Sequence, residues 1–184
     1  MRVSGKDLSK VTWWLRPFFW NQKRKYGQPL EAALLWACRP RLFAAVAFLY
    51  GMLDWKRSPV SPVIRSLVTV RVSQINHCRF CVDINSMTLT KRAGSMDKVV
   101  ALEGWRDNDA FTPQERAALD YAEAVTRTEG EVTEAMMAAL RDYWDDDGII
   151  ELTALIAFQN LSSKFNAALD VPPQGFCSKG EGEG

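Results

Sequence analysis

Helix start and stop signals punctuate the middle of this 184-residue chain and constrain its fold more than any other feature. Ser61-Pro62 is a cap residue followed by proline at the first helical position. Thr112-Pro113-Gln114-Glu115 adds the glutamate of a capping box. Lys91-Arg92 and Gly94 supply a basic last turn and a C-terminal stop. Further helices are expected over residues 95–104, 133–144 and 148–169.

Residues 67–72 form a segment with an ambiguous pattern. Leu67-Val68-Thr69-Val70-Arg71-Val72 alternates and is rich in β-branched residues, which is typical of a strand. The apolar residues also fit helical spacing, and we find no convincing second strand with which this one could pair. We therefore predict a helix here and an all-α fold in one domain, since the length suffices for one substantial core.

Three regions are expected along the chain. Residues 1–27 form an aromatic and basic extension, residues 28–171 a helical domain, and residues 172–184 a mobile tail that cannot bury enough apolar surface to order itself. The extension could be an arm that binds a membrane surface or a partner. Because Pro17 interrupts a continuous amphipathic helix, we favour instead a segment laid over the core by its aromatic side chains.

Apolar residues are most concentrated between Leu30 and Leu53, where charged residues and Pro40 interrupt them. We interpret this stretch as two buried helices that meet near Pro40, and not as a membrane span. The N-terminus shows no signal peptide, so a cytoplasmic location is expected. The 23 basic and 22 acidic side chains give a net charge of +1, which argues against a dedicated nucleic-acid surface.

Cys78-Arg79-Phe80-Cys81 is the motif that carries chemistry. Two cysteines three positions apart on a helix lie on the same face, near enough to bond. If Asn76 caps a helix that begins at His77, Cys78 lies in the first turn, where unpaired backbone N–H groups stabilise a thiolate. A protonated His77 and Arg79 would lower the thiol pKa further.

Two other interpretations of the cysteine pair remain open. The pair could be buried and inert, as unpaired cysteines often are. It could also supply half of a zinc site, with the remaining ligands coming from Cys38, Cys177 or His77, but no second CxxC and no histidine pair is present. We therefore expect no metal and no cofactor. The four cysteines are also too few and too uneven for a disulfide scaffold.

The run from Ile64 to Asn85 resembles the AhpD-like, or carboxymuconolactone decarboxylase, family. Ser73-Gln74-Ile75-Asn76 followed by CxxC is a fairly specific match. The resemblance continues through residues 111–126 and 149–169 and spans roughly residues 28–175. It implies a compact all-α fold that assembles into homo-oligomers, commonly dimers, trimers or hexamers.

The resemblance also implies a CxxC-dependent peroxidase or disulfide reductase without a metal or an organic cofactor. In the peroxidase branch Cys81 would attack the hydroperoxide and Cys78 would resolve the product, and an external dithiol would regenerate both thiols. A disulfide is the other expected substrate. The decarboxylase branch has no evident catalytic histidine in this chain.

The chain departs from the family at both positions of the proton relay. Ser66 stands at the glutamate position and Asn85 at the histidine position, and neither side chain titrates near neutral pH. Asn85 could still donate a hydrogen bond to the Cys81 sulfur, and Ser66 could hold a water. General acid–base help is worth about 10²–10⁴-fold in rate, so we expect slow peroxide reduction and less affected thiol–disulfide exchange.

A carboxylate from elsewhere could replace the relay. Glu115, Glu123 and Glu151 lie on other helices, although ordinary solvated or capping roles are expected for them, and Asp83 lies on a different side of its helix from Cys81. The rival interpretation is a non-catalytic binding or scaffold protein on the same fold. The missing relay and the aromatic, basic extension motivate it.

Overall fold

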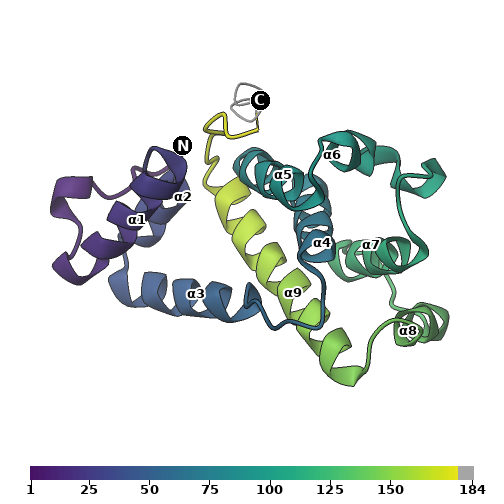
Figure 1. Cartoon of the computed structure of the whole chain (residues 1–184). Helices are drawn as coiled ribbons and strands as arrows, with labels where there is room; N and C mark the ends of the chain where they lie inside the picture. The colour runs from purple at the N-terminus through teal and green to yellow at the C-terminus, as the bar shows by residue number, and fades with distance from the viewer. Residues whose placement is uncertain (178–184) are drawn as a thin grey trace.

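The helix α4 (Pro62–Ile75) lies at the centre of the structure and packs against α5 (Arg79–Ala93), α7 (Pro113–Thr126) and α9 (Asp146–Ala168) (Figure 1). The computed structural model describes residues 1–177, and within that range it contains nine α-helices and three 3₁₀ helices and no strand. The predicted all-α fold is confirmed. The other α-helices are α1 (Arg16–Tyr26), α2 (Glu31–Trp36), α3 (Pro40–Leu53), α6 (Asp97–Ala101) and α8 (Glu134–Arg141).

The predicted helix caps form as expected. The Ser61 hydroxyl accepts from the Ile64 backbone N–H at 3.3 Å, and Thr112 and Glu115 make a complete capping box. Gly94 ends α5 in the left-handed conformation, with φ at 79°. The 3₁₀ helices are η1 (Leu8–Lys10), η2 (Trp13–Leu15) and η3 (Leu102–Asp107), and η3 replaces the end of the helix expected over residues 95–104.

The ambiguous segment, residues 67–72, lies inside α4 and is helical. Its apolar side chains are buried on every side of the helix, because Leu67, Val68, Val70 and Val72 are all 0% exposed. A helix that is covered all round carries apolar residues all round, which hides the 3.6-residue period. This burial explains why the sequence also matched a strand.

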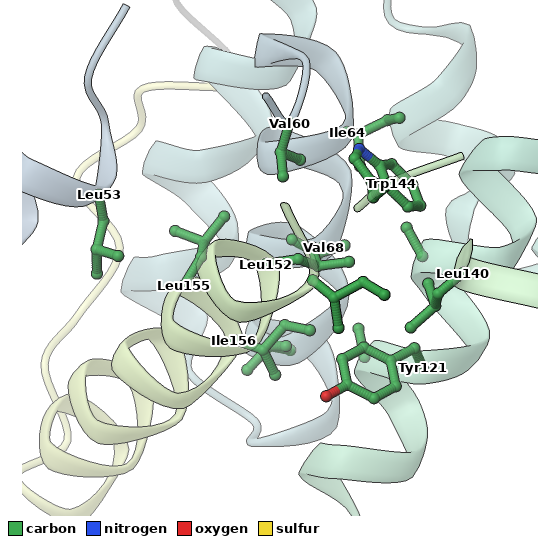
Figure 2. Packing of buried hydrophobic residues seen from close by; sticks show 14 of the residues in the cluster. Leu53, Val60, Ile64, Val68, Tyr121, Leu140, Trp144, Leu152, Leu155 and Ile156 are labelled. Carbon is green, nitrogen blue, oxygen red and sulfur yellow. The ribbon is translucent and has the colours of Figure 1, made fainter. Parts of the chain in front are cut away.

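The main core lies between α4, α7, α8 and α9. Leu152 and Ile156 of α9 point toward Val68 of α4 and Tyr121 of α7, while Trp144 closes the side of this core next to Ile64 (Figure 2). Leu152 and Ile156 are completely buried. This core therefore determines the position of α4, the helix that leads into the cysteine motif.

The N-terminal segment packs against α2 and α3, to one side of the α4–α9 bundle (Figure 1). Leu15, Phe19 and Phe43 belong to a separate small core there. Phe19 behaves as predicted for a segment laid down by its aromatics, but Trp13 and Trp20 are 76% and 65% exposed, so the prediction is wrong for these two. Leu15 and Phe19 pack with residues of α2 and α3 in this small core, and neither Trp13 nor Trp20 belongs to it.

The stretch from Leu30 to Leu53 does break into two helices near Pro40, but only the first is buried as predicted. α3 exposes Phe48 at 71% and Leu42 at 49%, because none of the other elements within residues 1–177 covers that side of it. Within residues 1–177, none of the helices has both the length and the apolar character needed to cross a bilayer.

Residues 172–177 pack against the helical domain, which differs from the unpacked segment predicted for the start of the tail. Phe176 is 2% exposed, and the backbone N–H groups of Gln174 and Cys177 each donate to the Asp83 carboxylate at 2.8 Å. The carboxylate supplies acceptors that the sequence of the segment itself does not reveal. The rest of the predicted tail, residues 178–184, lies outside the described residues.

Candidate active site around the cysteine pair

A tight turn between α4 and α5 places the cysteine pair. His77 adopts a left-handed conformation with φ at 53°, and the backbone N–H groups of His77 and Cys78 donate to the carbonyls of Gln74 and Ser73, both at 3.0 Å. These two bonds form a Schellman motif, with histidine where glycine is usual. The cap of α5 is therefore Cys78 and not Asn76, and the helix begins at Arg79, two residues later than predicted.

Cys78 and Cys81 are joined by a disulfide, with their Cα atoms 5.2 Å apart. The Cys78 sulfur also accepts from the Cys81 backbone N–H at 3.2 Å, in the place where a capping oxygen usually accepts. The predicted stabilisation of a Cys78 thiolate by the helix N-terminus concerns the reduced protein and stays a prediction. The predicted proximity of the two sulfurs is confirmed.

Cys81 borders a cavity of about 290 Å³, whereas Cys78 does not. Both cysteines are nearly excluded from bulk solvent, at 3% and 1% exposure, so the cavity is the route to the Cys81 sulfur. Most of the wall is apolar. Its aromatic members are Phe18, Tyr26, Trp36, Phe43, Tyr50, Phe80 and Phe158.

Residues of the N-terminal extension form part of this wall. Phe18, Gln22 and Tyr26 line the cavity from α1, together with residues of α5 and α9. Nothing in their spacing connects them with the cysteine motif, which lies more than fifty positions later. The extension therefore contacts the candidate site, a contact that the sequence did not reveal.

Ser73 links the polar side chains beside the cavity. Its hydroxyl accepts from Asn85 Nδ2 at 3.2 Å and from Gln159 Nε2 at 2.9 Å. The structure shows Asn85 donating to Ser73, and the hydrogen bond to the Cys81 sulfur that the sequence allowed is not formed. Asn166 Nδ2, from the end of α9, donates to the Cys81 sulfur instead, at 3.3 Å.

The two relay positions are not brought together. Asn85 lines the cavity, but Ser66 does not, and its buried hydroxyl accepts from Arg92 Nη1 at 3.1 Å. Arg92 also pairs with Asp54 at 2.7 Å. Ser66 thus belongs to an ion-paired cluster at the far end of the α4–α5 pair, and its hydroxyl already has a protein partner where a water was expected.

His77 and Arg79 lie at the surface. Arg79 is 68% exposed in its side chain and pairs with Asp170 at 3.0 Å. His77 is exposed one residue before Cys78. Their effect on the acidity of the thiols stays a prediction.

The candidate carboxylates do not line the cavity. Glu115 pairs with Lys98 and completes its capping box, and Glu123 binds Arg71, Arg106 and Trp105. Glu151 is likewise absent from the wall. Among the residues that the structure describes, no group of three histidine, cysteine, aspartate or glutamate side chains is arranged to hold a metal ion.

Sequence comparison identifies two curated relatives and a family. The model of the carboxymuconolactone decarboxylase family matches residues 40–124. The uncharacterized protein YnjA of Escherichia coli K12 is 45% identical over 170 residues, which are 92% of this chain and 93% of YnjA. The uncharacterized protein YdfG of Bacillus subtilis 168 is 27% identical over 115 residues, 62% of this chain and 78% of YdfG.

Solved structures share the fold over nearly the whole chain. An uncharacterized peroxidase-related protein from Ralstonia eutropha JMP134, described as an alkylhydroperoxidase AhpD core, superposes with a TM-score of 0.84 at 25% identity, covering 96% of this chain and 94% of that one. The debrominase Bmp8 superposes with the same TM-score and coverage at 22% identity. The latter similarity concerns the fold alone.

Proposed function

The chain belongs to the carboxymuconolactone decarboxylase family, and on that premise we propose that it is a CxxC-dependent thiol oxidoreductase. It reduces a hydroperoxide or exchanges disulfides, with Cys81 as the attacking thiol and Cys78 as its resolving partner. The observation that carries this proposal is the cavity, which reaches Cys81 but not the sulfur bonded to it. An external dithiol regenerates the pair.

The reaction with a hydroperoxide balances within this pair. The Cys81 thiolate attacks the terminal oxygen, the O–O bond breaks, and the alkoxide takes up a proton to leave as the alcohol. The Cys78 thiol then condenses with the sulfenic acid, which forms the disulfide and releases water. The external dithiol reduces this disulfide through a mixed disulfide and becomes oxidised itself.

The wall of the cavity explains both the substrate class and the expected rate. Its aromatic side chains suit an organic hydroperoxide. Within the described residues the wall contains neither a carboxylate nor an imidazole, so no such group takes the thiol proton near neutral pH. We expect peroxide reduction to be slow, and thiol–disulfide exchange to suffer less because the thiolate forms without a base.

Thiol counting tests the proposal. The protein reduced with dithiothreitol is treated with one equivalent of cumene hydroperoxide, and loss of two thiols with a Cys78–Cys81 disulfide in the peptide map is expected. Cys81→Ser should abolish this loss, whereas Cys38→Ser, which removes an exposed cysteine outside the cavity, should retain it. Thiols that ignore both the hydroperoxide and a disulfide reagent would contradict the proposal.

Reductive dehalogenation is a second candidate function. The aromatic side chains of the cavity wall favour it, because they can stack on a planar aromatic substrate. The debrominase Bmp8 has been solved in complex with 2,3,4-tribromopyrrole, in a variant that has alanine in place of one cysteine. In such a reaction two thiols become a disulfide, one C–Br bond becomes C–H, and bromide and a proton are released. Bromide release from tribromopyrrole by the reduced protein, absent in Cys81→Ser, would support this candidate over hydroperoxide reduction.

We also propose that the chain forms a homo-oligomer through α3 and α9. The exposed side chains Ile150, Ala154, Ala157 and Leu161 recur at intervals of four, three and four on α9, the spacing of a helix–helix seam. Phe48 of α3, the other helix in this proposal, is also exposed. Sedimentation should give a multiple of 20.8 kDa that falls to the monomer in Ile150→Glu but not in Val100→Glu on α6.

A non-catalytic binding protein remains the competing function. The exposed Trp13 and Trp20 favour it, since large apolar side chains in a surface segment often contact partners. If this is the function, the wild-type protein is redox-inert, and Trp13→Ala and Trp20→Ala should abolish the binding of its partner. Rapid disulfide formation in the thiol-counting experiment would exclude this function as the sole one.

A further inference from the structure

Asn166 contacts the candidate site at its reacting atom. It lies in the last turn of α9, is 2% exposed, and lines the cavity together with Cys81. Its backbone is fixed by a second Schellman motif, in which the Val171 N–H donates to the Asn166 carbonyl at 3.0 Å and Asp170 has φ at 52°. The end of α9 thus holds this side chain against the cysteine pair.

The two ends of the Asn166 amide have different surroundings. Nδ2 donates to the Cys81 sulfur at 3.3 Å. Oδ1 is buried, and within residues 1–177 it has no hydrogen-bond partner. Because buried polar atoms are almost always paired, an unpaired acceptor on a residue that lines the cavity and contacts the sulfur indicates the position of a ligand donor.

We propose, building on the thiol oxidoreductase function, that Asn166 is a catalytic residue. Its N–H stabilises the Cys81 thiolate, and its carbonyl oxygen accepts the O–H of the incoming hydroperoxide. The sulfur of a disulfide or a thiolate carries no hydrogen, so the amide must present its N–H to it. The O–H bond to Oδ1 then holds the terminal oxygen, the atom that sulfur attacks, next to the thiolate.

Asn166 makes the hydrogen bond to the Cys81 sulfur that the sequence analysis assigned to Asn85. Each sulfur of the pair receives one N–H, Cys78 from the backbone of Cys81 and Cys81 from Asn166. An amide does not titrate near neutral pH, so this support is independent of pH, but it also supplies no proton. Asn166 therefore assists the formation and orientation of the nucleophile, while the leaving alkoxide takes its proton from elsewhere.

The acidity of Cys81 tests the donor role without any turnover. In the reduced protein, the alkylation rate of Cys81 by iodoacetamide is followed against pH by peptide mapping, which separates it from the other thiols. Asn166→Ala should raise the Cys81 pKa by about one unit or more, a tenfold loss of thiolate at pH 7, since a hydrogen bond to a charged group contributes about that much. An unchanged pKa in a folded variant overturns the donor role.

A charge at the same place provides the matched comparison. Asn166→Asp keeps the shape of the side chain and should raise the Cys81 pKa more than Asn85→Asp, which puts the same charge on the same wall without a contact to sulfur. Equal shifts in the two variants would overturn a direct contact. The other titratable groups around the pair are common to all variants, namely Lys25, Tyr26, Tyr50, His77, Arg79, Asp83 and Asp170.

The acceptor role has its own measurement. At a pH where Cys81 is fully ionised, Asn166→Ala should react about tenfold more slowly with cumene hydroperoxide but at an unchanged rate with methyl methanethiosulfonate, which has no hydrogen-bond donor. Asn166→Gln should recover part of the loss. Equal rates with hydroperoxide in wild type and Asn166→Ala overturn the acceptor role. If wild type itself ignores hydroperoxide, the proposed function fails while the alkylation result still decides the donor role.

Discussion

Replacing Glu123 by glutamine should make the stability of the protein much less sensitive to acid. This carboxylate is buried in α7 and accepts from Trp105 Nε1 at 2.9 Å, Arg106 Nη1 at 2.8 Å and Arg71 Nε at 2.6 Å. Burial raises its pKa, but the three hydrogen bonds outweigh that effect and lower the pKa from 4.5 to about 2. Arg71 lies on α4, so the cluster also ties α7 to the helix that precedes the cysteines.

The size and the sign of the effect follow from that pKa. A drop from 4.5 to about 2 corresponds to about 3 kcal/mol of unfolding free energy. Because the folded-state pKa lies below the unfolded one, this stabilisation is fully present above pH 4.5 and is lost as the pH falls toward 2. Glu123→Gln removes the titrating group and leaves Arg71 without its ionised partner.

Urea unfolding at several pH values between 7 and 2.5 measures the effect. Wild type should exceed Glu123→Gln by about 3 kcal/mol at pH 7, and the difference should shrink steadily below pH 4.5. Glu129→Gln, at an exposed position, should follow wild type throughout. A difference between wild type and Glu123→Gln that stays constant across this range would refute the reasoning.

Three further changes test other parts of the structure. Asp83→Ala removes the acceptor of the Gln174 and Cys177 N–H groups, so it should lower the free energy of unfolding by about 2–3 kcal/mol. It should also speed proteolytic cleavage after residue 171, and an unchanged cleavage pattern would contradict this. Asn85→His places an imidazole on the cavity wall and should raise the rate of Cys81 oxidation by hydroperoxide at least tenfold near pH 7, measured by stopped flow; no gain would mean that the imidazole does not reach the reacting atoms. Leu152→Ala should cost about 2–5 kcal/mol in urea unfolding, and a loss below about 1 kcal/mol would show that the core refills the space.

The parts of the fold that were predictable depend on local signals. Ser61, Thr112 and Gly94 each act on backbone groups within a few residues, so their sequence positions were sufficient to locate helix ends. The proximity of Cys78 and Cys81 was equally local. Residues 67–72 needed one further step, the lack of a partner strand, because complete burial removed the helical period.

Most of the incorrect or missing predictions concern contacts between distant parts of the chain. Asn166 lies 85 positions after Cys81, and Asp83 lies 91 positions before Gln174, so no spacing rule connects them. The exposure of α3 depends equally on what surrounds it, because its residues are as apolar as those of a buried helix. Asn76 was a reasonable cap by residue type, but the left-handed turn at His77 moved the helix start to the next residues.

The left-handed turn at His77 has a consequence for the stability of the protein, which depends on the residue at this position. A residue with a Cβ gives up roughly 1 kcal/mol to adopt this conformation, and glycine adopts it without that loss. The imidazole of His77 is exposed to solvent. His77→Gly should therefore give a more stable protein with the same turn. Any redox property lost together with the imidazole would explain why the chain has histidine at this strained position beside the cysteine pair.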